Sequence, residues 1–107
     1  MSSSTAWQSL NGATKDFLSA VPGSMYKTQP FTGRFKTFAW EFACIVRTRL
    51  CYLEAFESGV LDFSTNAEIK DKSYYEHLDQ KTMQEILHET GVCITKVLRE
   101  EHSEELV

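Results

Sequence analysis

The sequence lacks the segments that would place a protein in a membrane or direct it out of the cell. No window of its 107 residues approaches the roughly 18 consecutive apolar residues that a membrane-spanning helix requires. Residues 1–8 lack the basic and apolar regions of a secretory signal peptide. We therefore expect a protein that is not exported and that has no membrane partner.

An excess of positive charge is also missing. The 11 basic and 15 acidic residues give a net charge of −4, which does not attract a phosphate backbone or an anionic lipid surface. The basic residues Arg34, Lys36, Arg47 and Arg49 are spread around one predicted helix and form no stripe. We therefore expect no nucleic-acid partner.

Cysteine is scarce, and its spacing matches no metal or redox motif. Cys44, Cys51 and Cys93 are odd in number and form no Cys-x-x-Cys pair. Reduced thiols in a cytoplasmic protein explain this pattern best. The sequence also lacks a Gly-x-Ser-x-Gly elbow, a P-loop, a dinucleotide fingerprint and an EF-hand loop. It therefore names no catalytic residue.

Proline is confined to Pro22 and Pro30, which lie in one short stretch. Apolar residues recur at steps of three and four over residues 4–20, over residues 33–58 and from about 80 to 103. This spacing is typical of amphipathic helices. It predicts three long helices, the first of which ends at Pro22 because proline cannot continue a helix.

The ends of these helices carry capping residues. Ser3 or Ser4 is suited to begin the first helix, Thr32 the second and Asp79 the third, because short oxygen-bearing side chains accept hydrogen bonds from the first backbone N–H groups. Gly59 is suited to end the second helix, since glycine adopts the left-handed backbone that closes many helices.

The remaining segments favour no other kind of structure. Residues 62–79 are polar and have no clear period, so we expect a long connection with at most one short helical turn. Little in the sequence favours strands. The patterns together predict an all-α fold, an antiparallel helical bundle of three long helices that forms one domain over residues 1–107.

Two of the predicted helices have distinct apolar faces. The stripe expected on the first helix consists of Trp7, Leu10, Thr14, Phe17 and Val21. The second helix is apolar on two faces, and a helix of that kind must contact several neighbours. It is therefore the predicted central helix of the bundle.

One segment resembles a known family. Arg49-x-x-Tyr52, the triplet Leu53-Glu54-Ala55, Gly59 and Asp62-Phe63-Ser64 are similar to the second-helix segment of the DinB-like family. The resemblance implies a four-helix, up-down-down-up bundle that is commonly dimeric. It also implies a divalent metal held by three histidines, one on the second helix and a His-x-x-x-His pair on the fourth.

The sequence departs from that family pattern. The histidine position of the second helix falls on Cys44, and the chain ends at Val107, about where the fourth helix would begin. We expect the last helix to be lacking or replaced. Cys44, Glu41 and His77 are the candidate ligands for zinc or nickel in a site completed across a dimer, since zinc requires about three protein ligands. The alternatives are a buried apolar role for Cys44 and a solvent-facing or capping role for His77.

A candidate ligand-binding pair lies on the same helix. Arg49 interrupts an otherwise apolar stripe, and Tyr52 follows it on the same face. Arg49 could hold a carboxylate or phosphate in the bundle cleft. The alternative that we favour from the sequence is an ion pair with an acidic group of the connection, such as Asp62 or Glu68.

Two functions remain open from the sequence. The first, which we favour, is a non-catalytic DinB-like bundle that needs no cofactor and acts through homodimerisation or by binding an unidentified small molecule. It follows from the apolar face of residues 35–56 that a missing fourth helix leaves uncovered. The second is a divalent-metal-dependent enzyme, a hydrolase or a thiol transferase.

Overall fold

The computed structural model describes residues 3–30, 33, 36–66 and 68–105, and the side chains of these residues except 3–4 and 101–105. Within these ranges the chain forms four α-helices and no strand: α1 (Ser3–Ala20), α2 (Phe38–Ser58), α3 (Lys72–Glu76) and α4 (Gln80–Glu105). A single turn of 3-10 helix, η1 (Gly23–Met25), follows α1. The predicted all-α helical bundle is confirmed.

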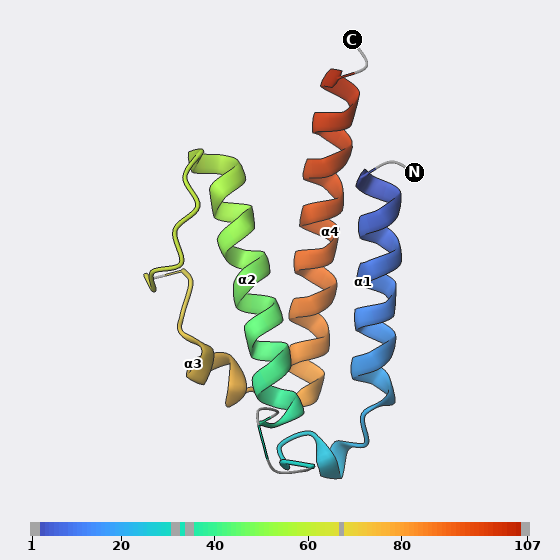
Figure 1. Cartoon of the computed structure of the whole chain (residues 1–107), viewed down its shortest axis with the longest axis vertical. Helices are drawn as coiled ribbons and strands as arrows, with labels where there is room; N and C mark the ends of the chain where they lie inside the picture. The colour runs from blue at the N-terminus through green and yellow to red at the C-terminus, as the bar shows by residue number, and fades with distance from the viewer. Residues whose placement is uncertain (1–2, 31–32, 34–35, 67, 106–107) are drawn as a thin grey trace.

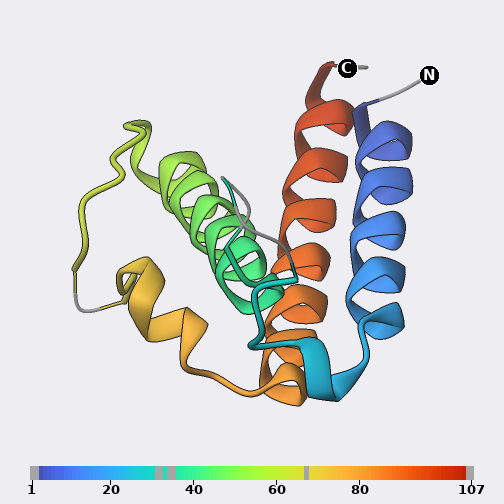
Figure 2. The same cartoon turned by 60° about the horizontal axis from the view of Figure 1, so that its bottom comes forward.

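The three long helices lie side by side, with α4 between α1 and α2 (Figures 1 and 2). Helix α1 runs antiparallel to α2 and α4, whereas α2 and α4 run parallel to each other (Figure 1). The parallel pair is possible because the connection that contains α3 returns along the side of α2 before α4 begins. The antiparallel arrangement predicted from the sequence therefore holds for α1 but not between α2 and α4.

Helix α2 begins later than the sequence predicts. Its cap is Thr37, whose backbone is extended and whose side-chain oxygen accepts a hydrogen bond from the N–H of Trp40 at 3.0 Å. The carbonyl of Tyr26 accepts a second N–H of the first turn, that of Ala39, at 2.9 Å. The predicted start after Thr32 is therefore wrong, and Thr32 itself lies outside the described residues.

The other predicted helix ends agree with the structure. Asp79 caps α4, because its Oδ1 accepts a hydrogen bond from the N–H of Thr82 at 2.7 Å. Gly59 ends α2 in the left-handed conformation with a φ of 79°. Helix α1 starts at Ser3, but the side chains of the predicted caps Ser3 and Ser4 lie outside the described part of the chain.

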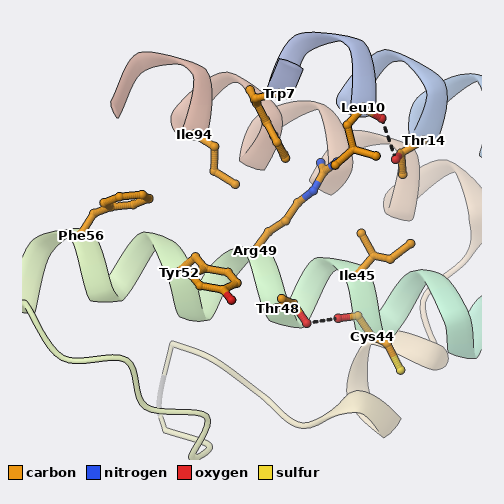
Figure 3. A pocket seen from close by; sticks show the side chains of 10 residues that line it. All are labelled: Trp7, Leu10, Thr14, Cys44, Ile45, Thr48, Arg49, Tyr52, Phe56 and Ile94. Carbon is orange, nitrogen blue, oxygen red and sulfur yellow. Dashed lines mark hydrogen bonds between the residues drawn. The ribbon is translucent and has the colours of Figure 1, made fainter. Parts of the chain in front are cut away.

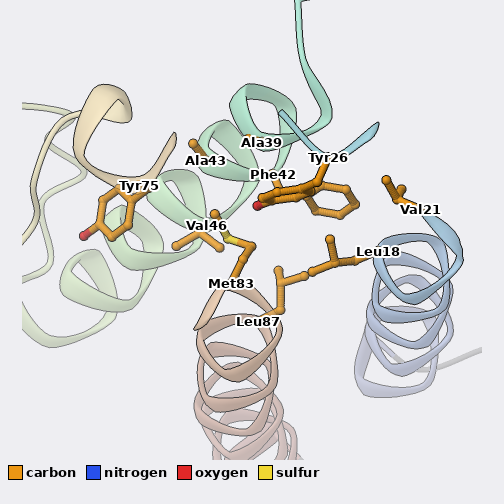
Figure 4. Close-up of a cluster of buried hydrophobic side chains, with 10 residues drawn as sticks. All are labelled: Leu18, Val21, Tyr26, Ala39, Phe42, Ala43, Val46, Tyr75, Met83 and Leu87. Atoms are coloured by element: carbon orange, nitrogen blue, oxygen red, sulfur yellow. The ribbon is translucent and has the colours of Figure 1, made fainter. Parts of the chain in front are cut away.

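The hydrophobic core lies at the end of the bundle where α1 ends and where α2 and α4 begin (Figure 4). It contains Leu18, Val21, Tyr26, Ala39, Phe42, Ala43, Val46, Tyr75, Met83 and Leu87. The amide of Gln80 closes this end, since its Nε2 donates hydrogen bonds to the carbonyls of Leu18 and Val21, both at 2.9 Å. The first turn of α4 thereby holds the last turn of α1.

A seam of polar contacts joins α1 to α4 along the rest of their length. The indole Nε1 of Trp7 donates a hydrogen bond to the hydroxyl of Thr95 at 3.0 Å. One turn further along α1, the amide of Asn11 packs directly on Gly91. A side chain at position 91 would overlap that amide, so the glycine permits the close approach of the two helices.

The apolar stripe predicted on α1 is partly wrong. Val21 is buried, but Leu10 is 61% exposed and Phe17 is 55% exposed, whereas Leu18 is fully buried. The reason is that α1 packs mainly on α4 through the face that carries Leu18. The face with Leu10 turns instead toward the space between α1 and α2.

Two further findings concern membrane-spanning segments and the cysteines. Among the described residues, no helix combines the length and the apolar character needed to cross a membrane. Cys44, Cys51 and Cys93 are free thiols, with Cys51 buried and Cys93 exposed.

Candidate functional site

A groove of about 500 Å³ opens between α1 and α2 (Figure 3). Helix α1 contributes Trp7, Leu10 and Thr14, and α4 contributes Ile94. Helix α2 contributes Cys44, Ile45, Thr48, Arg49, Tyr52 and Phe56. The volume of the groove lies within the range of about 300–1,000 Å³ that is typical of ligand pockets.

The groove exists because α1 and α2 contact each other closely at one end. There the ring of Phe17 lies against Phe38 and Phe42, with centroids 6.0 and 5.8 Å apart. Farther along, α4 lies between the two helices (Figures 1 and 2), and large apolar side chains of α2 stay partly exposed there. Tyr52 remains 46% exposed and Phe56 remains 42% exposed. The uncovered apolar face predicted from the sequence is therefore present.

Arg49 is the charged side chain of the groove. It extends from α2 toward α1 and α4 and is 5% exposed (Figure 3). Its Nη1 donates a hydrogen bond to the carbonyl of Leu87 at 3.0 Å and another to the hydroxyl of Thr90 at 3.4 Å. Burial lowers the pKa of the guanidinium, because an apolar environment disfavours the charged form.

The sequence favours a carboxylate partner for Arg49. Among the described residues, however, Arg49 pairs with no carboxylate. Arg47 makes the contact with the connection instead, since its guanidinium donates hydrogen bonds to the carbonyls of Lys70 and Phe63. Two positions along a helix correspond to about 200° of rotation, so Arg47 and Arg49 point to nearly opposite sides. The predicted ion pair of Arg49 with Asp62 or Glu68 is therefore wrong.

The guanidinium of Arg49 keeps part of its hydrogen-bonding capacity open. An arginine carries five N–H donors in a planar fork. Within the described part of the chain, Nη1 has both of its acceptors on α4, while Nε and Nη2 have none. These two groups form the edge of the fork that binds a carboxylate in a bidentate manner. Arg49 therefore presents three donors that the described residues do not satisfy.

The two threonine hydroxyls of the groove are occupied within their own helices. The hydroxyl of Thr14 donates to the carbonyl of Leu10 at 2.9 Å, and that of Thr48 donates to the carbonyl of Cys44 at 2.8 Å. Tyr52, the second predicted ligand-binding residue, lines the groove with Arg49, and its ring meets Phe63 edge-on at 6.4 Å. The groove is therefore largely apolar, with the guanidinium of Arg49 and the hydroxyl of Tyr52 as its remaining polar groups.

The three predicted metal ligands do not form a cluster within one chain. No group of three or more histidine, cysteine, aspartate or glutamate side chains among the described residues could hold a metal ion. The sulfur of Cys44 points away from Arg49 (Figure 3), and burial raises the pKa of its thiol, an effect that nearby Lys72 partly offsets. His77 ends α3, and its Nδ1 lies 2.6 Å from the carbonyl oxygen of Ser73. Glu41, the third predicted ligand, is half-buried in the first turn of α2.

Two residues of the site were missed by the analysis of the sequence. Trp7 covers the guanidinium of Arg49, with 4.8 Å between the guanidinium carbon and the centre of the indole ring. Thr90 accepts a hydrogen bond from the same group. Trp7 belongs to the apolar stripe predicted for the first helix, which gave a partial signal. Nothing in the sequence around Thr90 distinguishes it from other helical threonines.

Comparisons with models of protein families, with curated proteins and with solved structures give no match. The function is therefore argued from the groove itself.

Proposed function

We propose that this protein binds a small molecule in the groove between α1 and α2 and does not convert it chemically. The observation that carries the proposal is the position of Arg49, a buried cation with open donors in a concave apolar site. A few convergent polar groups within an apolar pocket are typical of small-molecule sites. Among the side chains that line the groove, none pairs a nucleophile with a general base.

The test is binding of a neutral apolar fluorophore, 1-N-phenylnaphthylamine, to the whole protein. Ile45→Glu places a charge in the groove wall, and we expect it to abolish binding. The matched control is Val92→Glu, which adds the same charge on α4 at a side chain that is 55% exposed and does not line the groove. Equal binding by both variants and by the unchanged protein contradicts the proposal.

Self-association through the same face is a second candidate function. Leu10 and Phe56, which both line the groove, are more than two-fifths exposed, and large apolar patches on a surface often mark an interface. A homodimer that covers this face would also close the groove. Sedimentation separates the two candidates: a dimer that excludes the fluorophore and dissociates on Ile45→Glu supports self-association, whereas a monomer that binds it supports the ligand site.

The DinB-like resemblance is retained as part of the proposal. An antiparallel α1 followed by parallel α2 and α4, joined by a long connection, is the order that the resemblance implies for the first three helices. The cytoplasmic location is likewise a proposal, supported by the free thiols of Cys44, Cys51 and Cys93.

The metal-dependent alternative needs ligands from a second copy, since one chain does not bring three together in its described part. Its test is metal analysis of protein purified without an affinity tag. Near-stoichiometric zinc or nickel that is lost on Cys44→Ala, but kept on Cys93→Ala, would establish a metal site at Cys44.

A further inference from the structure

The charge of Arg49 has no counter-charge among the residues that the structure describes. Burying an isolated charge is costly unless a partner of opposite sign accompanies it. Arg49 is 5% exposed, and burial alone accounts for its lowered pKa, with no carboxylate among the described residues to offset it. The groove that holds this cation is open to solvent on one side, so the counter-ion can come from outside.

We infer that the molecule bound in the groove is an organic acid with one carboxylate and an apolar body, and that its carboxylate pairs with Arg49. This inference rests on the proposed binding of a small molecule in the groove. The open Nε and Nη2 donors of Arg49 match the two oxygens of a carboxylate. Their orientation is set by α4, because Leu87 and Thr90 hold the opposite side of the guanidinium.

The other side chains that line the groove restrict the chemistry of the ligand beyond its carboxylate. Thr14 and Thr48 donate their hydroxyl hydrogens to their own helices, so the hydroxyl of Tyr52 is the one that remains in the lining for a second polar group of a ligand. A phosphate dianion would need a second cation, and Arg49 is the one basic side chain among those that line the groove. A single acid group with an apolar remainder therefore matches the lining best.

The length of the apolar wall sets an approximate size for the ligand. Arg49 and Phe56 are seven residues apart on α2, which corresponds to about 10.5 Å along the helix axis. Ile94 and Tyr52 lie along this stretch (Figure 3). A medium-length acyl chain spans such a distance. Trp7 lies over the acid-binding end because it contacts the guanidinium.

The experiment compares three probes of equal chain length by calorimetric titration: decanol below its solubility limit, and decanoate and decyltrimethylammonium below their micellar concentrations. We expect decanoate to bind at least about tenfold more tightly than decanol, because hydrogen bonds between charged groups are stronger than those between neutral groups. The ammonium probe should bind more weakly than decanol, because it brings a second positive charge to a buried cation.

Arg49→Met is the decisive variant, because it keeps a long side chain and removes the charge. It should bind decanoate no better than decanol. Arg47→Met is the matched control, since it removes the same charge from the opposite side of the same helix and should keep the preference for the acid. If Arg49→Met does not fold, Arg49→Lys keeps the charge without the planar fork and should reduce the preference.

A spectroscopic measurement reports on the acid-binding end directly. The sequence contains two tryptophans, so Trp40→Phe leaves Trp7 as the sole indole. Decanoate should shift the emission of Trp7, whereas decyltrimethylammonium should not. An unchanged emission spectrum at saturating decanoate overturns the assignment of the carboxylate to Arg49.

The outcomes separate the two proposals. If decanoate and decanol bind equally to the unchanged protein, the inference about the acid is overturned while the ligand groove stands. If none of the three probes binds, and 1-N-phenylnaphthylamine does not bind either, both proposals are overturned. If the protein sediments as a dimer that excludes every probe, the occupant of the groove is a second copy of the chain.

Discussion

Arg49 of α2 lies against Trp7 of α1, with its guanidinium carbon 4.8 Å from the centre of the indole ring. A cation over an aromatic face at this distance is attracted by the ring quadrupole. Trp7 is in turn held by α4, because its Nε1 donates to the hydroxyl of Thr95. The position of the groove's charge therefore depends on all three long helices at once.

The first prediction contrasts two arginines of α2. We expect Arg49→Met to raise the free energy of unfolding by about 1 kcal/mol, because it removes a buried charge that has no carboxylate partner. No helical hydrogen bond is lost, since the hydroxyl of Thr90 still donates to the carbonyl of Ile86. Urea denaturation followed by circular dichroism gives the value.

Arg47→Met is the control for that measurement. It should lower the free energy of unfolding by about 1 kcal/mol, because the carbonyls of Lys70 and Phe63 each lose a donor. A loss of stability in Arg49→Met as large as that in Arg47→Met would show that the contacts of Arg49 stabilise the fold, and it would contradict the prediction.

The second prediction uses two helical glycines as a matched pair. A methyl group at Gly91 would lie 2.7 Å from the amide atoms of Asn11, whereas a methyl group at Gly12 would have nothing within 4 Å. Gly91→Ala should therefore destabilise the protein by about 1–3 kcal/mol through overpacking. Gly12→Ala should stabilise it by about 0.5–1 kcal/mol, because alanine favours the helix.

The double variant Asn11→Ala/Gly91→Ala tests the cause of that difference. Removing the amide makes room for the new methyl group, so part of the lost stability should return. Thermal unfolding of the four proteins under one set of conditions measures the coupling. Strict additivity of the two substitutions would place the strain somewhere other than the α1–α4 seam.

The third prediction concerns stability at alkaline pH. Tyr26 is 2% exposed, and its hydroxyl has no hydrogen-bond partner among the described residues. Burial, with a smaller contribution from the charge of Asp79, raises the pKa of Tyr26 to about 12. Because the folded pKa exceeds the ordinary value of 10.0, this contribution to stability is complete below pH 10 and is lost as the pH rises from 10 through about 12.

Tyr26→Phe should therefore flatten the alkaline decline in the free energy of unfolding. It should also raise stability at neutral pH by about 1 kcal/mol, because it removes a buried polar group without a partner. Tyr74→Phe is the control at a side chain that is 51% exposed. Urea midpoints measured across the alkaline range, together with a tyrosinate titration by absorbance, check both statements. An unchanged alkaline decline in Tyr26→Phe rules out the assignment.

The fourth prediction concerns stability at acid pH. Hydrogen bonds from the side chain and backbone of Thr82 lower the pKa of Asp79, and those from the side chain of Ser73 and the backbone of Tyr74 lower the pKa of Asp71. Their contribution is present above the ordinary value of 3.8 and is lost as the pH falls through the lower folded values.

Asn at these two positions keeps an acceptor for the cap but does not titrate. We expect Asp79→Asn and Asp71→Asn to leave the helix content near pH 7 unchanged and to reduce the steepness of acid unfolding. Asp16→Asn, at an exposed position on α1, is the control. Circular dichroism as a function of pH measures the transition, and an unaltered acid limb in both cap variants would refute the role of these carboxylates.

The sequence predicted the parts of the fold that depend on neighbouring residues. Asp79 and Gly59 make their capping hydrogen bonds with residues three and four positions away, so their roles at helix ends were predictable. The start of α2 was not predictable, because its first turn is capped both by the side chain of Thr37 and by the distant carbonyl of Tyr26, which accepts a hydrogen bond from the N–H of Ala39. Local oxygen-bearing side chains alone do not decide between competing caps.

The candidate site was predicted in part. Arg49 was marked because its charge interrupts an apolar stripe, and Tyr52 because it follows on the same face; both line the groove. The partner of Arg49 was predicted wrongly, because its acceptors, Leu87 and Thr90, lie 38 and 41 positions away and come close only through the packing of α4 on α2.

The periodicity of apolar residues and the capping residues by themselves determined that this chain is helical and where most of its helices end, because those effects act over one or two turns. Tertiary structure alone decided which apolar face stayed open, since that depends on α4 separating α1 from α2. It also decided that Arg49 is buried without a carboxylate. The reason is that the packing of the surrounding helices sets both the local dielectric constant around a side chain and the groups that it can contact.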